Sequence, residues 1–387
     1  MPRIPHPNRP SALRRLGGRR RPGPSRAARA RPAPGAAAGV VYAALVYALA
    51  ACAPPPEGPL ASDLLFPVRV DGQVGLIDAA GRMVVQPRFE LAGAMEEDRI
   101  AVAENGRWGY ADATGAVVIE PRFGDAAPFS GGLAAVVVDQ TLEAEEGGDG
   151  PVLMLGAGTA GLRSGGWIDL SGELVIEARF AGVTTFSEGL AAAREGELWG
   201  YVDPTGAWAI TPRFAAASPF SEGLAVAAET AGAVGFIGPD GEWAITPAFT
   251  DAYAFSERLA AARVTDGTWG FVRPDGSWAV EPGYYWAGRF GAGLAPVKIG
   301  ARWGYVDAEG RVVIEPRYER AETFSEERAA VQLPGGDWGY IDTAGEPMGE
   351  PRWDRAQPFS GGLASVKEGD AWGWVGRDGQ VVWEPSF

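Results

Sequence analysis

The sequence predicts an all-β protein made of nine tandem three-stranded antiparallel units of about 35 residues each. The first observation is a glycine that recurs at intervals of 34 or 35 residues, with one interval of 57. The second is a phrase repeated around that glycine, in which large and small side chains alternate with the period of two expected of a strand. A fixed period of this length indicates stacked or ring-like repeats that share one core. The nine glycines are Gly75, Gly109, Gly166, Gly200, Gly235, Gly270, Gly304, Gly339 and Gly373.

Residues 294–318 show the three expected strands of a unit most clearly. The first run, 294–298, reaches the second run, 303–307, through a turn that contains Gly300. Asp307 and Gly310 then predict a hairpin turn, because Asp accepts backbone hydrogen bonds and Gly tolerates a positive φ. The third run ends in Pro-Arg-Tyr, where proline lacks the N–H that a central strand would use. A connection with Phe and Ser follows, and we expect it to fill the seam between neighbouring units.

The tandem repeat is compatible with two architectures, a propeller-like ring and an open superhelical array. Nine units exceed the four to eight blades of most propellers, which favours the open array. The array starts on a first-type strand near Phe66 and ends on a third-type strand at Phe387, so the two ends could also complete one shared blade. We expect a signature tryptophan such as Trp303 to be buried in either case.

The repeated phrase resembles the WG-repeat (KWG-repeat) family, which is common in bacteria. The resemblance covers residues 66–387 and rests on the phrase Trp-Gly-Tyr-x-Asp-x-x-Gly, with Pro-x-Phe and Phe-Ser-x-Gly-Leu-Ala following it. It implies a β-rich repeat with an interaction-type function, and it supplies no catalytic residue.

The N-terminal segment predicts a bacterial lipoprotein. Residues 1–51 hold ten arginines and no acidic residue, and an apolar stretch fills residues 40–51. Leu49-Ala50-Ala51-Cys52 resembles the lipobox, which implies cleavage before Cys52 and lipid attachment to it. Residues 52–64 then form a Pro-rich tether, and residues 65–387 form the repeat array, with an insertion near residues 140–162. The expected location is the cell envelope, anchored to a membrane and outside the cytoplasm.

Composition excludes several functions. Removal of the leader would leave 24 basic and 49 acidic residues, a charge that repels nucleic acid. His6 is the only histidine and Cys52 the only cysteine, so the mature chain cannot form a histidine-dependent triad or an ordinary zinc site. We expect no catalytic residue, no metal and no cofactor. A hydrolase that uses paired carboxylates stays open as an alternative.

Aromatic residues offer two candidate contact sites. Tyr285 and Trp286 depart from the repeat and are candidate ligand contacts, against the alternative that they only pack the seam. Trp208, Trp243 and Trp278 occupy one repeat position and form either part of the core or a binding row. The sequence predicts a non-enzymatic interaction scaffold whose partner is a protein or glycan of the cell envelope. The alternative is a module that binds carbohydrate or peptidoglycan.

Overall fold

The computed structural model describes residues 64–140, 162–230 and 232–386. The chain divides into Met1–Leu45, which lies outside these residues, and Val46–Phe387, which holds every described strand. The described residues form 35 β-strands and no α-helix. The prediction of an all-β protein is confirmed.

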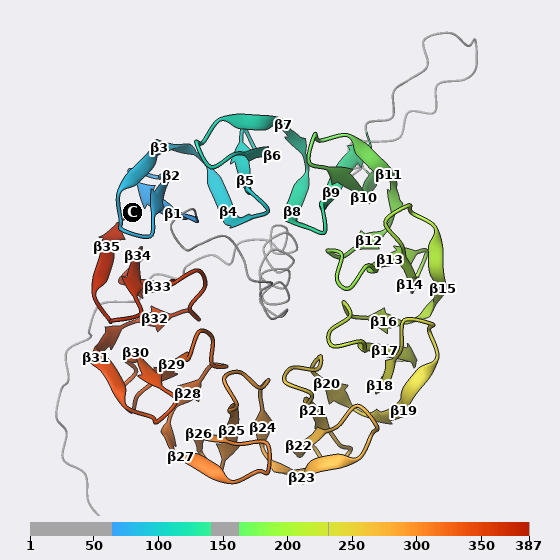
Figure 1. Ribbon diagram of the computed structural model, residues 1–387, viewed down its shortest axis with the longest axis vertical. Coiled ribbons are helices and arrows are strands. Elements are labelled where there is room, and N and C mark those ends of the chain that lie inside the picture. Colours follow the sequence, from blue (N-terminus) through green and yellow to red (C-terminus); the bar gives the residue numbers. More distant parts are fainter. Residues whose placement is uncertain (1–63, 141–161, 231, 387) are drawn as a thin grey trace, which may run out of the picture. The chain divides into compact units, whose positions relative to one another are not determined.

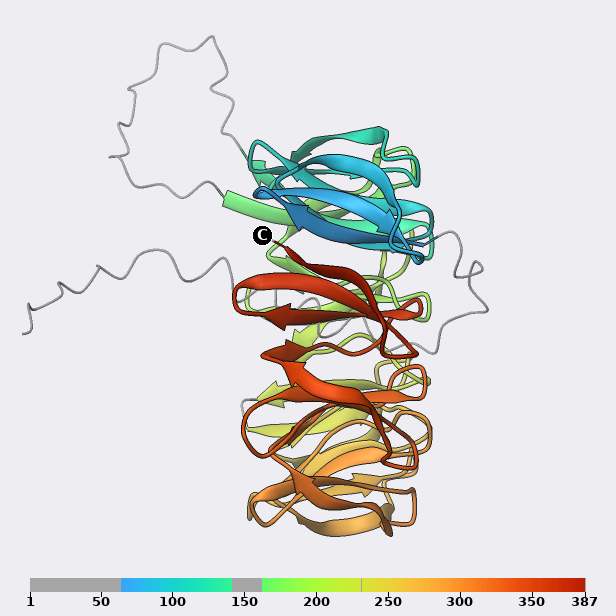
Figure 2. The ribbon, with the colours of Figure 1, turned by 90° about the vertical axis from the view of Figure 1, so that its left-hand side faces the viewer.

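The strands form nine antiparallel sheets that are arranged as the blades of a closed ring, a nine-bladed β-propeller (Figure 1). Seen edge-on, the strands of each blade cross the thickness of the ring (Figure 2). We number the blades 1 to 9 in chain order. Within each blade the strands pair in chain order, and the last strand lies at the outside of the ring.

The first four blades contain strands of two to eight residues. Blade 1 holds β1 (Leu65–Val70), β2 (Gln73–Asp78) and β3 (Met83–Phe89); blade 2 holds β4 (Leu91–Glu96), β5 (Arg99–Glu104), β6 (Arg107–Ala111) and β7 (Val117–Phe123); blade 3 holds β8 (Asp125–Ser130), β9 (Leu133–Gln140), β10 (Leu162–Asp169) and β11 (Leu174–Phe180); blade 4 holds β12 (Gly182–Val183), β13 (Ala191–Glu195), β14 (Leu198–Val202) and β15 (Trp208–Phe214).

The remaining five blades repeat the same four-stranded order. Blade 5 holds β16 (Ala216–Ala217), β17 (Ala225–Thr230), β18 (Ala233–Ile237) and β19 (Trp243–Phe249); blade 6 holds β20 (Asp251–Ala252), β21 (Ala260–Arg263), β22 (Trp269–Val272) and β23 (Trp278–Tyr284); blade 7 holds β24 (Trp286–Ala287), β25 (Ala295–Ile299), β26 (Arg302–Val306) and β27 (Val312–Tyr318); blade 8 holds β28 (Arg320–Ala321), β29 (Arg328–Gln332), β30 (Trp338–Asp342) and β31 (Pro347–Trp353); blade 9 holds β32 (Arg355–Ala356), β33 (Leu363–Glu368), β34 (Ala371–Gly376) and β35 (Val381–Ser386).

Eight blades therefore have one strand more than the three that the sequence predicts. The additional strand lies nearest the middle of the ring and comes from the connection that carries Phe and Ser. In blades 4 to 9 it is only two residues long, too short to show an alternating pattern. Among the described residues, blade 1 has three strands.

The signature glycine is required by a close approach between two strands. None of the nine glycines has a positive φ, so turn formation does not explain them. In blade 4 the outer strand bulges opposite Gly200, between the pairs Trp199 with Phe214 and Tyr201 with Ile210. A Cβ added to Gly200 would overlap the carbonyl oxygen of Ile210 and lie 2.7 Å from the nitrogen of Pro212. The glycine thus allows the outer strand to cross directly over its neighbour.

Blades 9 and 1 pack against each other and close the ring. The rings of Phe66 and Trp374 lie 5.2 Å apart, edge to face. The indole N–H of Trp374 donates to the carbonyl of Pro67 at 2.8 Å, and the hydroxyl of Ser386 donates to the carbonyl of Arg69 at 2.5 Å. The preference for an open array is therefore wrong.

The alternative of a ring closed by one blade shared between the two ends also needs correction. Blade 9 has four strands of its own, so side-chain packing joins it to blade 1. The ring thus closes with nine blades, more than the four to eight of most propellers.

Two further sequence predictions concern Trp303 and the insertion near residues 140–162. Trp303 is only half-buried, whereas Trp269 and Trp338 at the same repeat position are 1% and 6% exposed, so the predicted burial of the signature tryptophan holds in some blades and not in others. The insertion extends the hairpin of β9 and β10, which pair as far as Gln140 and Leu162. Residues 141–161 of the insertion lie outside the described residues.

Candidate binding surface

The serine of the Phe-Ser connection joins five of the blades to the next one. The hydroxyl of Ser187 donates to the carbonyl of Phe220 in the following blade at 2.7 Å. The signature tyrosine acts across the same boundary, since Tyr201 donates to the carbonyl of Ser218 at 2.7 Å and packs on Phe220 at 4.9 Å. Equivalent serine bonds join Ser130 to Phe186, Ser221 to Phe255, Ser256 to Phe290 and Ser325 to Phe359.

The arginine of the Pro-Arg-Phe phrase forms a second bond between blades. Arg122 lies 5.0 Å over the ring of Phe123 and donates to the carbonyl of Gly172, in the Asp-x-x-Gly turn of the next blade, at 2.7 Å. Arg88, Arg179, Arg213 and Arg317 reach the turn glycines Gly115, Gly206, Gly241 and Gly345 in the same way.

The glutamate that follows the serine forms a third bond between blades. Glu188 and Gly189 both have positive φ, at 53° and 80°, as a type I′ turn between Ser187 and Leu190 requires. A positive φ is unfavourable for glutamate. The Glu188 carboxylate also accepts a hydrogen bond from the N–H of Gly223 in the next blade at 2.9 Å, which offsets part of that cost.

The aspartate of the Asp-x-x-Gly turn is used within its own blade. One oxygen of Asp203 accepts hydrogen bonds from the hydroxyl of Thr205 at 2.6 Å and from its N–H at 2.9 Å. These bonds, the hydroxyl bond first, hold the pKa of Asp203 below its usual value. The recurring polar side chains of the array are thus engaged in holding the turns and the blade boundaries.

The row of Trp208, Trp243 and Trp278 packs between blades. Each indole meets, edge to face, the last aromatic residue of the preceding outer strand, at 5.5 to 5.8 Å. All three are half-buried, so the structure favours the core interpretation over a binding row. The alanines that follow two of them, Ala209 and Ala244, face solvent.

Tyr285 and Trp286 lie where blade 6 passes into blade 7. Tyr285 connects β23 to β24 and is 69% exposed, the largest value among the exposed large hydrophobic side chains. Trp286 begins β24, pairs with Lys298 and is 40% exposed. Both side chains are accessible, as a ligand contact requires.

The structure adds two aromatic residues to Trp286. The ring of Trp269 lies 5.2 Å from Trp286 and is stacked on Tyr253 at 5.5 Å. The Trp286 side chain also hydrogen-bonds the hydroxyl of Tyr253. Burial, followed by the charge of Asp251, raises the pKa of Tyr253, so this phenol stays neutral. We call Tyr253, Trp269, Tyr285 and Trp286 the aromatic cluster.

The aromatic cluster combines a rigid base with an exposed edge. Trp269 is 1% exposed and anchors the group, while Trp286 and Tyr285 present their rings to solvent. The sequence analysis did not identify Tyr253. The equivalent residues Thr184 and Ser218 are small and polar, and this difference is the signal that could have identified it. The cluster can offer flat apolar surface with polar edges to a protein side chain or a sugar ring.

Other predicted features fall outside the described residues or are absent from them. Cys52 and the leader lie before residue 64. No helix among the described residues is long and apolar enough to cross a membrane. Within those same residues, no group of His, Cys, Asp and Glu side chains is placed to hold a metal ion.

The fold and the repeated contacts define a tandem-repeat propeller whose blades are joined by the signature residues themselves. The family model described as WG containing repeat matches residues 75–108, 108–141, 166–199, 199–228, 235–267, 269–303, 303–335 and 338–372. The chain belongs to this family, as the resemblance of the phrase predicted. None of the curated proteins matches the sequence.

Similar chains are found among the solved structures. A structure described as the eukaryotic initiation factor is 14% identical, has a TM-score of 0.56, and is matched over 84% of this chain and 95% of that chain. The computationally designed Ika8 protein is 14% identical with a TM-score of 0.43, over 75% of this chain and 93% of its own. At such identity the first likeness concerns the fold alone.

Proposed function

We propose that this WG-repeat propeller is a non-enzymatic interaction scaffold, anchored by lipid and held outside the cytoplasm. One observation carries the non-enzymatic part: the recurring carboxylates are committed to backbone N–H groups. Glu188 and Asp203 exemplify the two classes, one between blades and one within a turn. A hydrolase would need two carboxylates free to act on a substrate, and the carboxylates that recur in the repeat are not free in this way.

The ligand contacts of the scaffold are Tyr285 and Trp286. Their exposure distinguishes them from the aromatic residues that pack between blades. Trp269 and Tyr253 hold Trp286 in place, so binding would fix few additional rotamers and lose little entropy. The partner is a protein or glycan of the cell envelope.

A pull-down from the native envelope tests this contact surface. Tyr285→Ala combined with Trp286→Ala is expected to weaken capture of the partner by about tenfold or more, the range of moderate hot spots. Trp372→Ala is the matched control, because Trp372 is 39% exposed but lies in blade 9. If the control loses the partner and the double variant keeps it, Tyr285 and Trp286 are not the contact.

A carbohydrate or peptidoglycan ligand is the second candidate. The exposed face of Trp286 and the adjoining Tyr285 suit the apolar face of a sugar ring. Binding of soluble peptidoglycan fragments, measured by calorimetry, should then disappear in the double variant. Capture of a protein from an envelope freed of glycan would instead favour the protein partner.

The anchor rests on the Leu-Ala-Ala-Cys sequence at residues 49–52. The Pro-rich residues 53–59 lie between that cysteine and β1, and such a segment is stiff enough to hold a propeller away from a membrane. Cys52→Ala should release the protein from membranes or leave a longer precursor. A variant of mature size that still partitions with membranes would contradict the anchor.

A further inference from the structure

The boundary between blades 8 and 9 departs from the seven boundaries that precede it in the chain. At seven consecutive boundaries a Val or Ile of the outer strand packs against the turn glycine of the next blade. These pairs are Val85 with Gly115, Ile119 with Gly172, Ile176 with Gly206, Ile210 with Gly241, Ile245 with Gly276, Val280 with Gly310, and Ile314 with Gly345. Blade 8 has Gly349 at this position.

Gly349 also changes the path of the outer strand. Its φ is +71°, and Tyr340 pairs with Met348, whereas in blade 7 Tyr305 pairs with Ile314, the residue equivalent to Gly349. A Cβ added to Gly379, the turn glycine of blade 9, would find only the Met348 and Gly349 backbone, at 3.6 Å or more. The space that isoleucine fills elsewhere is therefore open.

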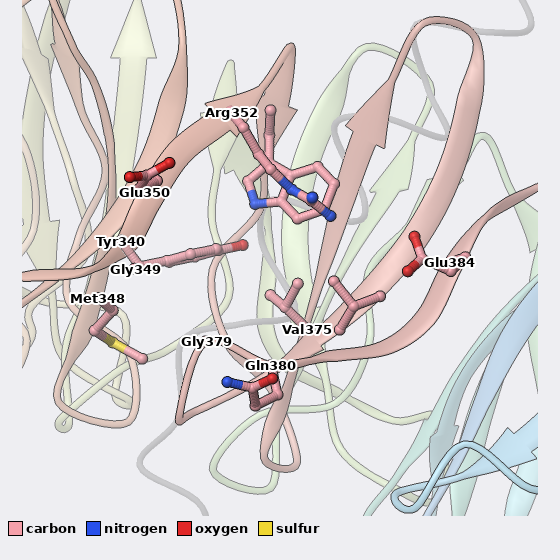
Figure 3. A pocket seen from close by; sticks show the side chains of 12 residues that line it. Tyr340, Met348, Gly349, Glu350, Arg352, Val375, Gly379, Gln380 and Glu384 are labelled. Carbon is pink, nitrogen blue, oxygen red and sulfur yellow. The ribbon is translucent and has the colours of Figure 1, made fainter.

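A cavity of about 470 Å³ occupies this boundary (Figure 3). The buried side chains of Tyr340, Trp353 and Val375 form its apolar floor, and the half-buried Met348 and Val381 contribute further apolar wall.

Arg352 lines the same cavity and lacks the bond that its counterparts make. In blade 7, Arg317 donates to the carbonyl of Gly345 at 2.7 Å. Within the described chain, Arg352 has no hydrogen bond or ion pair, and its guanidinium lies 4.2 Å over the ring of Trp353. Stacking thus orients a guanidinium whose N–H groups are available to a ligand.

Two carboxylates complete the rim. Glu350 and Glu384 are exposed and lie on either side of Arg352 in Figure 3. A purely anionic ligand would be attracted by Arg352 but repelled by both glutamates. A purely cationic ligand would be attracted by both glutamates but repelled by Arg352. A molecule that carries both charges on one apolar body complements the whole cavity.

We propose that the cavity between blades 8 and 9 binds a free apolar α-amino acid. Its carboxylate pairs with the guanidinium of Arg352, its ammonium group with Glu350 or Glu384, and its side chain packs on Val375 and Met348. The site lies in different blades from the aromatic cluster and is independent of the proposed scaffold function.

Calorimetric titration of the purified protein tests the ligand class. L-Leucine is expected to bind saturably. N-Acetyl-leucine, which lacks the ammonium group, and leucinamide, which lacks the carboxylate, should each bind at least about tenfold more weakly, since each loses a charge-assisted contact. No saturable binding of leucine, or equal binding of all three compounds, would overturn the proposal.

A pair of variants separates binding from stability. Arg352→Met should lower leucine affinity by about tenfold or more, while the melting temperature changes little, because this arginine bridges no boundary. The matched Arg317→Met should lower the melting temperature through loss of its bond to Gly345 and leave leucine affinity unchanged. Unchanged leucine affinity in Arg352→Met would refute the assigned contact.

Discussion

At the scale of single residues, the repeated phrase is a set of hydrogen-bond donors and acceptors with fixed destinations. Ser221 shows this well: it is 7% exposed, and its hydroxyl donates to the carbonyl of Phe255 in the next blade at 2.8 Å. The sequence predicted the role of the turn aspartates from local chemistry. It could not predict the destinations of Ser221 or Arg122, because both bonds cross blade boundaries and depend on how the blades pack.

The turn aspartates give the fold a pH dependence of known sign. The hydroxyl of Thr205 is the first cause of the low pKa of Asp203, so Thr205→Ala should raise that pKa toward the ordinary value. A lowered carboxyl pKa stabilises the fold above the pKa of the unfolded chain, and the contribution is lost as pH falls through the folded pKa.

The measurement is an NMR titration of the Asp203 carboxyl carbon, with urea unfolding at neutral and acid pH. The stability difference between the wild type and Thr205→Ala should be present at neutral pH and shrink in acid. Thr211→Ala, an exposed residue outside the turn, is the control. An unchanged Asp203 titration in Thr205→Ala would contradict this explanation of the turn.

At the scale of elements, the blade is a meander whose outer strand crosses closely over its neighbour. Period-two alternation was enough to predict the three longer strands. The innermost strands of blades 4 to 9 escaped prediction because two residues carry no periodicity. The reason why the signature position requires glycine could not be predicted either, since it arises from the bulge in a strand that lies about ten residues further along the chain.

Gly200→Ala tests the close approach of the strands. The added Cβ would overlap the backbone of Ile210 and Pro212, which cannot move as a flexible side chain does. We expect a loss of about 3 kcal/mol or more, as for strongly overpacked cores. Gly196→Ala is the control, because a Cβ there meets nothing within 4 Å and only the positive φ of 60° opposes it, at a cost of about 1 kcal/mol. Equal losses in urea unfolding would show that packing does not explain the glycine.

At the scale of the molecule, nine similar boundaries make a ring, and the departures from similarity mark its candidate sites. Tyr285 and Trp286 were identifiable from the sequence because they break the repeat. Tyr253 and the cavity beside Gly349 were not, since one depends on contact with Trp269 and the other on the loss of an isoleucine at a boundary. Ring closure could not be predicted either, because the rotation per blade is set by packing.

The closed ring is the central claim, and a distance across its seam tests it most directly. Asp71, Asn105 and Asp370 are exposed and lie in equivalent hairpin turns of blades 1, 2 and 9. Spin labels can be attached to cysteines introduced at these positions in a Cys52→Ser background. The distances between the labels are then measured by pulsed electron paramagnetic resonance. The ring predicts that the distance from 71 to 370 matches the distance from 71 to 105, because each pair spans one blade boundary. A distance from 71 to 370 several times longer than the control would show an open array.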